Sequence, residues 1–343
     1  MVTVPAIQRD VVVVGASAGG VEALRALAGS LPADFPAAIL VVMHLSPGSR
    51  SALPLILDRA GPLPAFPATH GAPLQPGVIH VATPDRHLLT DDGSLVLTRG
   101  PTENGHRPAI NATFRSAAVT AGPRAIGVIL SGTLDDGALG LRSIVDRGGL
   151  AVVQDPVDAL YAGMPENALA LVDAECVLPA AEIGPALDKL VRRPVEEAAA
   201  PQLSAALLLE DRIARDGVRL GSVVPDEDLP PSGFTCPDCQ GALMEVDTAG
   251  QYRCRIGHAW SAEALLGAQD TEFQRALWTA LRSLDEKASL VRRLRRDSEH
   301  RNHGMLADRY ATTAKECAEA AETLRKFLFS LSADPDSEVE TSP

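Results

Sequence analysis

The stretch that most constrains this chain is VVVVGASAGG, residues 11–20, which precedes an alanine- and leucine-rich run over residues 21–27. Four consecutive valines are typical of a strand buried on both faces of a parallel sheet. The glycines suit a tight turn, and the following run has helical character. This order of strand, turn and helix places Ser17 beyond the carboxyl end of a strand, beside the free N–H groups that begin a helix.

Two kinds of site use such a turn, and a simple helix cap is the structural alternative. A phosphate-binding turn has the pattern Gly-x-Gly-x-x-Gly, which the glycines at positions 15, 19 and 20 fit poorly. A nucleophile on a strand-to-helix turn has the pattern Gly-x-Ser-x-Gly, which Gly15, Ser17 and Gly19 match. A serine at this place also caps helices without any catalytic role. The turn alone leaves the nucleophile and the cap open.

Length and composition indicate a globular protein with more than one folded unit, in a reducing compartment. A chain of 343 residues can bury a large core. Its formal net charge of −13 argues against a general nucleic-acid binder. The sequence shows no secretory signal pattern and no apolar run of membrane-spanning length, and its five cysteines then favour metal ligands over disulfides. We therefore expect a cytoplasmic protein that binds no nucleic acid and inserts into no membrane.

Strand-like and helix-like segments alternate from residue 9 to about residue 192, which is typical of a parallel sheet covered by helices. The expected strands include residues 11–14, 37–43, 78–82, 125–130 and 150–153, and the expected helices include 49–59 and 111–121. Two shorter strands flank the turn Asp91-Asp92-Gly93-Ser94 and predict an antiparallel hairpin at one edge of the sheet. The predicted fold class is α/β, a three-layer, doubly wound and mostly parallel sheet.

Three strand ends in this domain carry side chains suited to hydrolysis. Ser17 follows the first strand, His44 follows the second, and Asp136 lies in the loop after the strand that ends at residue 130. Catalytic groups of open parallel sheets gather beyond the carboxyl ends of the strands. A serine nucleophile needs a base, and the base needs an acidic partner, so together they predict a catalytic triad. Taken singly, His44 also suits the edge of a core, and Asp136 also suits a cap before the next helix.

Five motifs occur in the order and approximate spacing of a known family: Gly15-Ala-Ser-Ala-Gly-Gly20, Met43-His-Leu-Ser-Pro-Gly48, Arg107-Pro-Ala-Ile-Asn-Ala-Thr-Phe-Arg-Ser116, Ser131-Gly-Thr-Leu-Asp-Asp-Gly137 and Gly163-Met-Pro165. Over residues 9–192 the chain resembles the catalytic domain of the chemotaxis protein-glutamate methylesterases, the CheB family. The resemblance implies Ser17 as nucleophile, His44 as base and Asp136 as acid, with no catalytic cofactor. The order Ser-His-Asp along the chain differs from the Ser-Asp-His order of α/β-hydrolases.

The resemblance also implies a substrate and a control mechanism. The substrate is a glutamyl methyl ester on a chemoreceptor or related signalling protein, and deamidation of receptor glutamines is a further expected activity. Backbone N–H groups near Ala18 and Gly19 are expected to bind the oxyanion, with Thr133 as a further donor. Ala18, Thr133, Leu134 and Met43 depart from the residues frequent in the family, which bears on substrate preference and rate. Because the sequence starts at the catalytic strand, we expect a receiver-less member without phosphorylation control in cis.

Two other functions are compatible with the same residues. A non-catalytic signalling scaffold would keep the fold for docking, although a scaffold has no need of all three triad residues. A small-molecule carboxylesterase would use the same triad. Hydrolysis of a simple chromogenic ester without hydrolysis of receptor esters would favour the small-molecule esterase.

The C-terminal third contains a Cys/His module. Cys236-x-x-Cys239 and Cys254-x-x-x-His258 supply four ligands with the spacing of two zinc knuckles joined by a short hairpin, the pattern of a small zinc ribbon. We expect a structural zinc ion, since no open ligand position is evident. A redox pair of Cys236 and Cys239 is the alternative.

Two long helical patterns follow the Cys/His module. One apolar stripe consists of Phe273, Leu277, Leu281, Leu284, Val291 and Leu294, and a second of Tyr310, Ala314, Cys317, Ala321, Leu324, Leu328 and Leu331. We expect a helical hairpin broken at Asn302-His-Gly304 that packs on itself, with self-association or partner docking as the alternative use. The predicted segments are therefore a catalytic domain (9–192), a linker with a short helix (193–232), a Cys/His module (233–268), a helical hairpin (269–332) and a disordered tail (333–343).

Overall fold

The valine-rich run forms β1 (Val11–Ala16), at the centre of a parallel sheet. The structure is a computed structural model that describes residues 8–44, 48, 51–195, 201–216, 230–246 and 250–332. In this described part the sheet has seven strands in the order β3-β4-β2-β1-β7-β8-β9. The other strands are β2 (Ala38–Met43), β3 (Ala65–Pro67), β4 (Ile79–Val81), β7 (Ala125–Ile129), β8 (Leu150–Gln154) and β9 (Cys176–Leu178).

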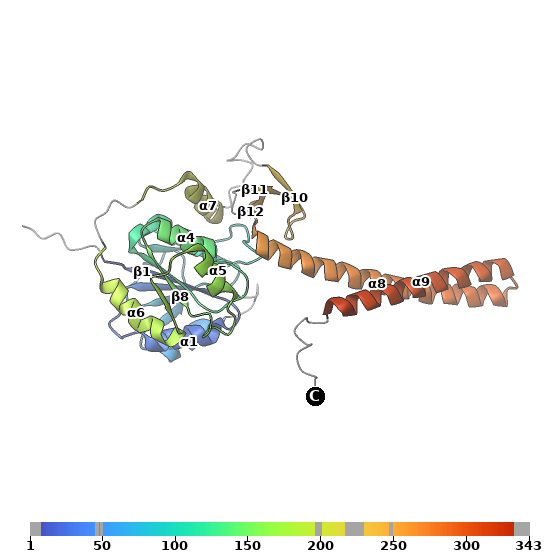
Figure 1. Cartoon of the computed structure of the whole chain (residues 1–343), viewed down its shortest axis with the longest axis horizontal. Coiled ribbons are helices and arrows are strands. Elements are labelled where there is room, and N and C mark those ends of the chain that lie inside the picture. Colours follow the sequence, from blue (N-terminus) through green and yellow to red (C-terminus); the bar gives the residue numbers. More distant parts are fainter. Residues whose placement is uncertain are drawn as a thin grey trace, which may run out of the picture. The chain divides into compact units, whose positions relative to one another are not determined.

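Helices cover both faces of this sheet, so every residue of β1 is buried (Figure 1). Val12 and Val14 pack in one core, with α1 (Gly20–Ser30), α2 (Leu53–Ala60) and α6 (Ala180–Arg192). Val11 and Val13 pack in the other core, with α3 (Ile110–Thr120), α4 (Ala138–Asp146) and α5 (Gly163–Leu171). A 3₁₀ turn, η1 (Gly122–Arg124), leads into β7. The predicted three-layer α/β fold is confirmed. The predicted helix start at Ser49 lies outside the described residues.

The predicted hairpin is present as β5 (His87–Asp91) and β6 (Ser94–Thr98), but it does not extend an edge of the large sheet. It forms a separate two-stranded sheet. Leu88 and Leu95 pack in the same core as Phe114 of α3, and Thr90 N donates a hydrogen bond of 2.8 Å to Ser116 Oγ on that helix. Burial of its apolar face against α3 therefore stabilises the hairpin, which does not pair with an edge strand of the large sheet.

The stretch predicted as a linker contains α7 (Ala205–Asp216), which packs on α3 and β6. Thr98 Oγ1 donates a 2.7 Å hydrogen bond to the carbonyl oxygen of Ala214. Arg215 Nη2 donates to the carbonyl oxygen of Thr90 at 2.6 Å. These bonds hold α7 against the catalytic domain.

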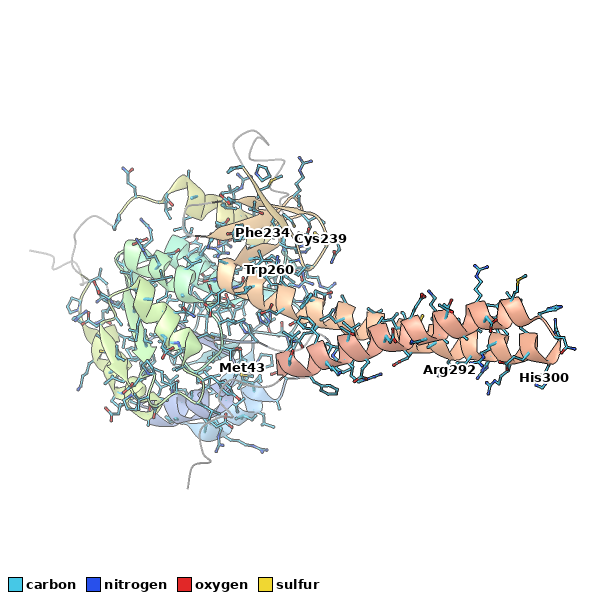
Figure 2. All side chains as sticks on the ribbon, turned by 45° about the vertical axis from the view of Figure 1, so that its right-hand side comes forward. Met43, Phe234, Cys239, Trp260, Arg292 and His300 are labelled. Carbon is cyan, nitrogen blue, oxygen red and sulfur yellow. The ribbon has the colours of Figure 1, made fainter. Side chains whose placement is uncertain are left out.

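The Cys/His module is a four-stranded antiparallel sheet that carries Phe234, Cys239 and Trp260 (Figure 2). Its strands are β10 (Pro231–Thr235), β11 (Ala242–Glu245), β12 (Gln251–Cys254) and β13 (Ala259–Ser261). We call it the small sheet. The chain divides into two compact units between Leu265 and Leu266, so the small sheet belongs to the same unit as the catalytic domain.

The second unit is the predicted helical hairpin, which is confirmed. It consists of most of α8 (Ala262–His300) and of α9 (Gly304–Ser332). Leu281 of α8 and Ala321 and Leu328 of α9 form its buried core. Phe273 and Phe327 add an edge-to-face contact with ring centroids 6.4 Å apart. None of the helices described here is both long and apolar enough to cross a membrane.

A buried group of charges joins the small sheet to the catalytic domain. Arg253 on β12 donates from Nε to Glu210 Oε1 of α7 at 2.8 Å, and its Nη2 lies 3.4 Å from Glu103 Oε1. Glu103 also accepts from Arg115 of α3. Because two buried carboxylates face two buried guanidinium groups, removal of one partner leaves an uncompensated charge.

We therefore expect Arg253→Ala to lower the free energy of unfolding of the first unit by about 3–5 kcal/mol. Arg142→Ala, which removes an exposed ion pair with Asp146 on α4 of the same unit, is the matched control and should cost less than about 1 kcal/mol. The measurement is urea unfolding followed by the fluorescence of Trp260, with Trp278→Phe in both variants. Equal destabilisation by the two substitutions would contradict the role given to the buried charges.

Candidate active site

Ser17 lies in the turn between β1 and α1. Its backbone N–H donates to the carbonyl oxygen of Ser131 at 2.9 Å, and its own carbonyl oxygen accepts from Gly20 N at 2.9 Å. The first bond ties the turn to the loop after β7, and the second begins α1. The position of Ser17 is therefore set by backbone hydrogen bonds to the loop after β7 and to the first residue of α1.

The glycines around Ser17 are required by close packing and by backbone conformation. A Cβ atom at Gly15 would lie 2.3 Å from Ile110 Cγ2 of α3. Gly19 has a φ of +69°, and a Cβ atom there would lie 2.7 Å from Ser131 Oγ. Any side chain at either position would displace the turn. The Gly-x-Ser-x-Gly pattern thus follows from the way this turn packs between α3 and the loop after β7.

His44 follows β2 and lies between Ser17 and Asp136. Its Nδ1 is 3.0 Å from Ser17 Oγ, and its Nε2 is 2.7 Å from Asp136 Oδ2. A carboxylate only accepts hydrogen bonds, so Nε2 carries the proton and Nδ1 accepts from the hydroxyl. The structure thus brings together the three residues that the sequence predicted for the triad.

Asp136 is buried, and backbone N–H groups at the start of α3 hold its carboxylate in position. Its two carboxylate oxygens accept hydrogen bonds from Ile110 N at 2.8 Å and Asn111 N at 3.1 Å. Burial alone would raise the pKa of Asp136, but the hydrogen bond and charge of His44, with the Ile110 N–H, lower it below its usual value. The cap of α4 is Gly137, so Asp136 does not cap the helix that follows it.

His106 is a further residue of the site that sequence reasoning missed. Its ring stacks on the ring of His44, with centroids 3.7 Å apart and an interplanar angle of 8°. Burial, and then the charge of His44, lower the pKa of His106 to about 4, so this ring is neutral near pH 7. In the sequence, the one feature that could have indicated a role for His106 in the site is its position directly before the Arg107-Pro-Ala motif.

Asp135 is the second group whose surroundings the sequence did not reveal. Its Oδ1 accepts a 2.8 Å hydrogen bond from Ser261 Oγ at the end of β13. Burial raises the pKa of Asp135 to about 6 despite that bond, and the charge of Asp136 adds to the increase. The two adjacent aspartates therefore have opposite pKa shifts.

The residues expected at the oxyanion site lie near the Ser17 turn and in the loop after β7. Among the described residues, the backbone N–H groups of Ala18 and Gly19 have no hydrogen-bond acceptor. Ser131 Oγ donates to the Ala18 carbonyl oxygen at 2.8 Å and fixes that peptide. Thr133 is exposed in the loop. The next residue, Leu134, has a φ of +60°, a conformation that favours glycine.

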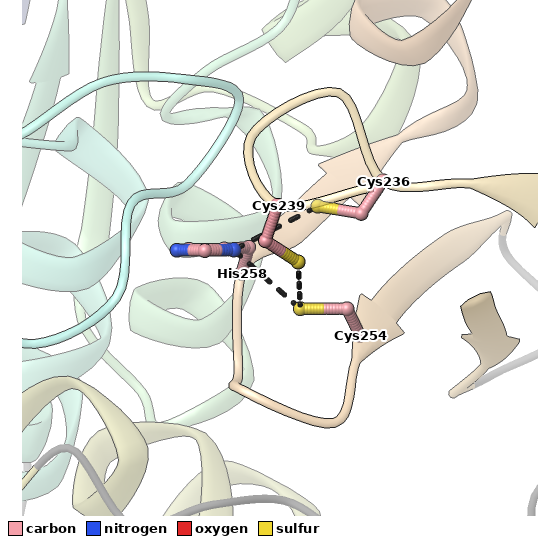
Figure 3. A group of neighbouring side chains, drawn as sticks. All are labelled: Cys236, Cys239, Cys254 and His258. Carbon is pink, nitrogen blue, oxygen red and sulfur yellow. Dashed lines mark hydrogen bonds between the residues drawn. The ribbon is translucent and has the colours of Figure 1, made fainter. Parts of the chain in front are cut away.

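The four predicted metal ligands converge on one point of the small sheet (Figure 3). Cys236 Sγ and Cys254 Sγ lie 3.7 and 3.5 Å from His258 Nδ1, and Cys239 Sγ lies 3.6 Å from Cys254 Sγ. Tetrahedral zinc with its usual bond lengths would separate two sulfur atoms by about 3.8 Å, and sulfur from nitrogen by about 3.6 Å. The donor set and its spacing fit a four-coordinate metal ion.

Comparison with known proteins gives the class of this domain. The family model described as CheB methylesterase matches residues 12–187, just over half of the chain. The chain therefore belongs to the CheB methylesterase family. The crystal structure of the Thermotoga maritima CheB methylesterase catalytic domain has a TM-score of 0.52 and 33% sequence identity, and the match covers 54% of this chain and 100% of that one.

Two similar proteins are named protein-glutamate methylesterase/protein-glutamine glutaminase 2. The protein of Burkholderia lata is 39% identical over 191 residues, which are 55% of this chain and 56% of the relative. The protein of Anaeromyxobacter dehalogenans is 41% identical over 183 residues, which are 53% of this chain and 54% of the relative. The chain thus spans about half the length of the curated relatives that it matches.

The raised pKa of Asp135 predicts that the effect of this residue on the free energy of unfolding depends on pH. The folded-state value of about 6 lies above the ordinary value of 3.8, so this carboxyl contributes stability when it is protonated and loses that contribution as pH rises through 6. Asn is neutral at every pH and keeps the acceptor for Ser261. We expect Asp135→Asn to stabilise the protein more at about pH 8 than at about pH 5, by about 1–2 kcal/mol.

The measurement is urea unfolding of both proteins at the two pH values. Asp146→Asn on α4 is the control, because Asp146 is exposed in an ion pair with Arg142. A gain in stability from Asp135→Asn that does not depend on pH would contradict the raised pKa.

Proposed function

We propose that this chain hydrolyses glutamyl methyl esters on a chemoreceptor or a related signalling protein, and that it also deamidates glutamine side chains. The continuous hydrogen-bond chain from Ser17 through His44 to Asp136 carries this proposal. It lies in the domain that matches the CheB methylesterase family, and both activities appear in the names of the relatives. We place the activity in the cytoplasm.

Ser17, His44 and Asp136 have separate roles in the proposed mechanism. His44 Nδ1 takes the hydroxyl proton of Ser17 as Oγ attacks the ester carbonyl carbon. Asp136 holds the Nε2–H tautomer and stabilises the imidazolium that forms. The imidazolium then gives its proton to the leaving methoxide, and methanol departs. Water, deprotonated by His44, then attacks the acyl-enzyme. This step leaves a glutamate side chain on the receptor and returns the free hydroxyl group of Ser17.

The negative charge of the tetrahedral intermediate needs donors that point at the carbonyl oxygen. The backbone N–H groups of Ala18 and Gly19 lie directly before the first residue of α1, where the helix dipole favours negative charge. We propose these two groups as the oxyanion donors, with Thr133 as a further donor. Loss of one such donor typically lowers kcat by about 10²–10³-fold.

The decisive variant is Ser17→Ala, which removes the nucleophile. We expect methanol release from methylated chemoreceptor membranes to fall by at least about 10³-fold, because the other triad residues cannot act without the serine. Ser143→Ala on α4 is the matched control, since Ser143 Oγ donates only to the Leu139 carbonyl oxygen within its own helix.

The possible results separate the candidate functions. Release by wild type and Ser143→Ala but not by Ser17→Ala supports the methylesterase. Hydrolysis of a chromogenic ester without methanol release would replace it with a small-molecule carboxylesterase. Equal inactivity of all three proteins on both substrates would favour a non-catalytic scaffold.

We also propose that Cys236, Cys239, Cys254 and His258 hold a structural zinc ion. Three thiolates and one imidazole fill a tetrahedral shell and leave no position for a substrate. In this role the ion would stabilise the small sheet and would take no part in the ester chemistry.

One zinc ion per chain is expected by elemental analysis of the purified protein. Cys254→Ser should abolish the bound zinc and lower the midpoint of thermal unfolding of the first unit. Cys317→Ser is the control. Cys317 lies in α9, which is far from these ligands in the sequence and belongs to the other compact unit. Full zinc occupancy in Cys254→Ser would rule out this ligand set.

A further inference from the structure

The small sheet docks on the loop that leads to the active site. Glu103 forms a parallel bridge with Ala259 of β13. Asn104 N donates to the Ala259 carbonyl oxygen at 2.8 Å, and Ala259 N donates to the Thr102 carbonyl oxygen at 3.1 Å. β13 therefore adds to the loop 102–106 by backbone pairing, although more than 150 residues separate the two segments in the sequence.

Side chains strengthen this contact at three places. Ser261 N donates to Asn104 Oδ1 at 2.9 Å, and Ser261 Oγ donates to Asp135 Oδ1 at 2.8 Å. The ring of Trp260 packs so closely on Gly105 that a Cβ atom there would lie 3.3 Å from it. The end of β13 thus holds both the loop 102–106 and the residue next to Asp136.

The residue that follows Gly105 is His106, whose ring covers one face of the His44 imidazole. The two hydrogen bonds of His44, to Ser17 and to Asp136, lie at the edge of that imidazole. Rotation of the ring out of its plane would break both bonds. A ring stacked at 3.7 Å opposes this rotation.

We infer that the small sheet is a positioning element of the active site: β13 holds the loop 102–106, and His106 thereby keeps the His44 imidazole in line with Ser17 and Asp136. His106 is a positioning residue, since it acts on the ester through His44. This inference rests on the proposed esterase function for its kinetic consequence, but the stacking itself is independent of any substrate.

The kinetic test compares His106→Ala with His106→Phe in the full chain. His106→Ala removes the ring and should lower kcat for methanol release by about 10- to 100-fold, because small losses of alignment have effects of this size. KM should change less than twofold, since a residue that acts only through the alignment of His44 affects the rate of the reaction and not the binding of the substrate. His106→Phe keeps a flat ring and should restore most of the rate.

The second test uses NMR and needs no activity. In the stacked pair, the ring protons of His44 lie in the shielding region of the neighbouring ring and should resonate upfield. This shift should be lost in His106→Ala and kept in His106→Phe. The double variant Asn104→Gly/Ser261→Ala removes two side-chain bonds to β13, and glycine suits the φ of +51° at position 104. The backbone bonds of Ala259 remain, so the variant should reduce this shift without abolishing it, although His106 is intact.

Ser283→Ala on α8 is the matched control for the double variant, because Ser283 Oγ donates only to the Thr279 carbonyl oxygen of the same helix. Unchanged His44 signals in the double variant would overturn the role of the small sheet. Unchanged signals and kcat in His106→Ala would overturn the role of His106. If wild type releases no methanol but the NMR shifts follow this pattern, the proposed function fails and the positioning role stands.

Discussion

The carboxylate of Asp136 is the interaction on which the architecture of the site depends. A buried charge is stable only when several donors surround it, and this one has His44 and the first N–H groups of α3. The same carboxylate thus orients the imidazole and satisfies the beginning of a helix whose dipole favours a negative charge there. Since α3 packs against β1, β2 and β7, Asp136 links the core of the domain to the site.

The sheet order explains why the three side chains of the site meet. β1 lies between β2 and β7, with Gly15 in register with Val42 on one side and Ile129 on the other. The carboxyl ends of these three strands therefore lie side by side, at the place where the chain reverses its direction of winding. Short loops from the three ends bring Ser17, His44 and Asp136 within hydrogen-bond distance of one another. From outside the parallel sheet, the loop 102–106 adds His106, whose ring stacks on His44, and β13 of the small sheet pairs with this loop.

Much of this arrangement could be predicted from local patterns. The valine run of β1, the glycines beside Ser17 and the spacing of the four Cys and His residues each depend on neighbours close in the sequence. The hairpin was predicted too, but not its packing on α3, since Leu88 and Leu95 do not reveal which surface they will meet. His106, the Asp135–Ser261 bond and the burial of Arg253 could not be predicted. Each depends on a contact between segments far apart in the chain, for which periodicity and spacing give no signal.

In the proposed mechanism Ser17 Oγ is the atom that carries the acyl group. Mass spectrometry of the protein quenched during hydrolysis of p-nitrophenyl acetate tests this claim most directly. The predicted result is one acetyl group on the peptide that contains Ser17, absent from the same peptide of Ser17→Ala and formed much more slowly in His44→Ala. Ester hydrolysis with the acetyl group on another residue, or at a rate that Ser17→Ala leaves unchanged, would contradict the account.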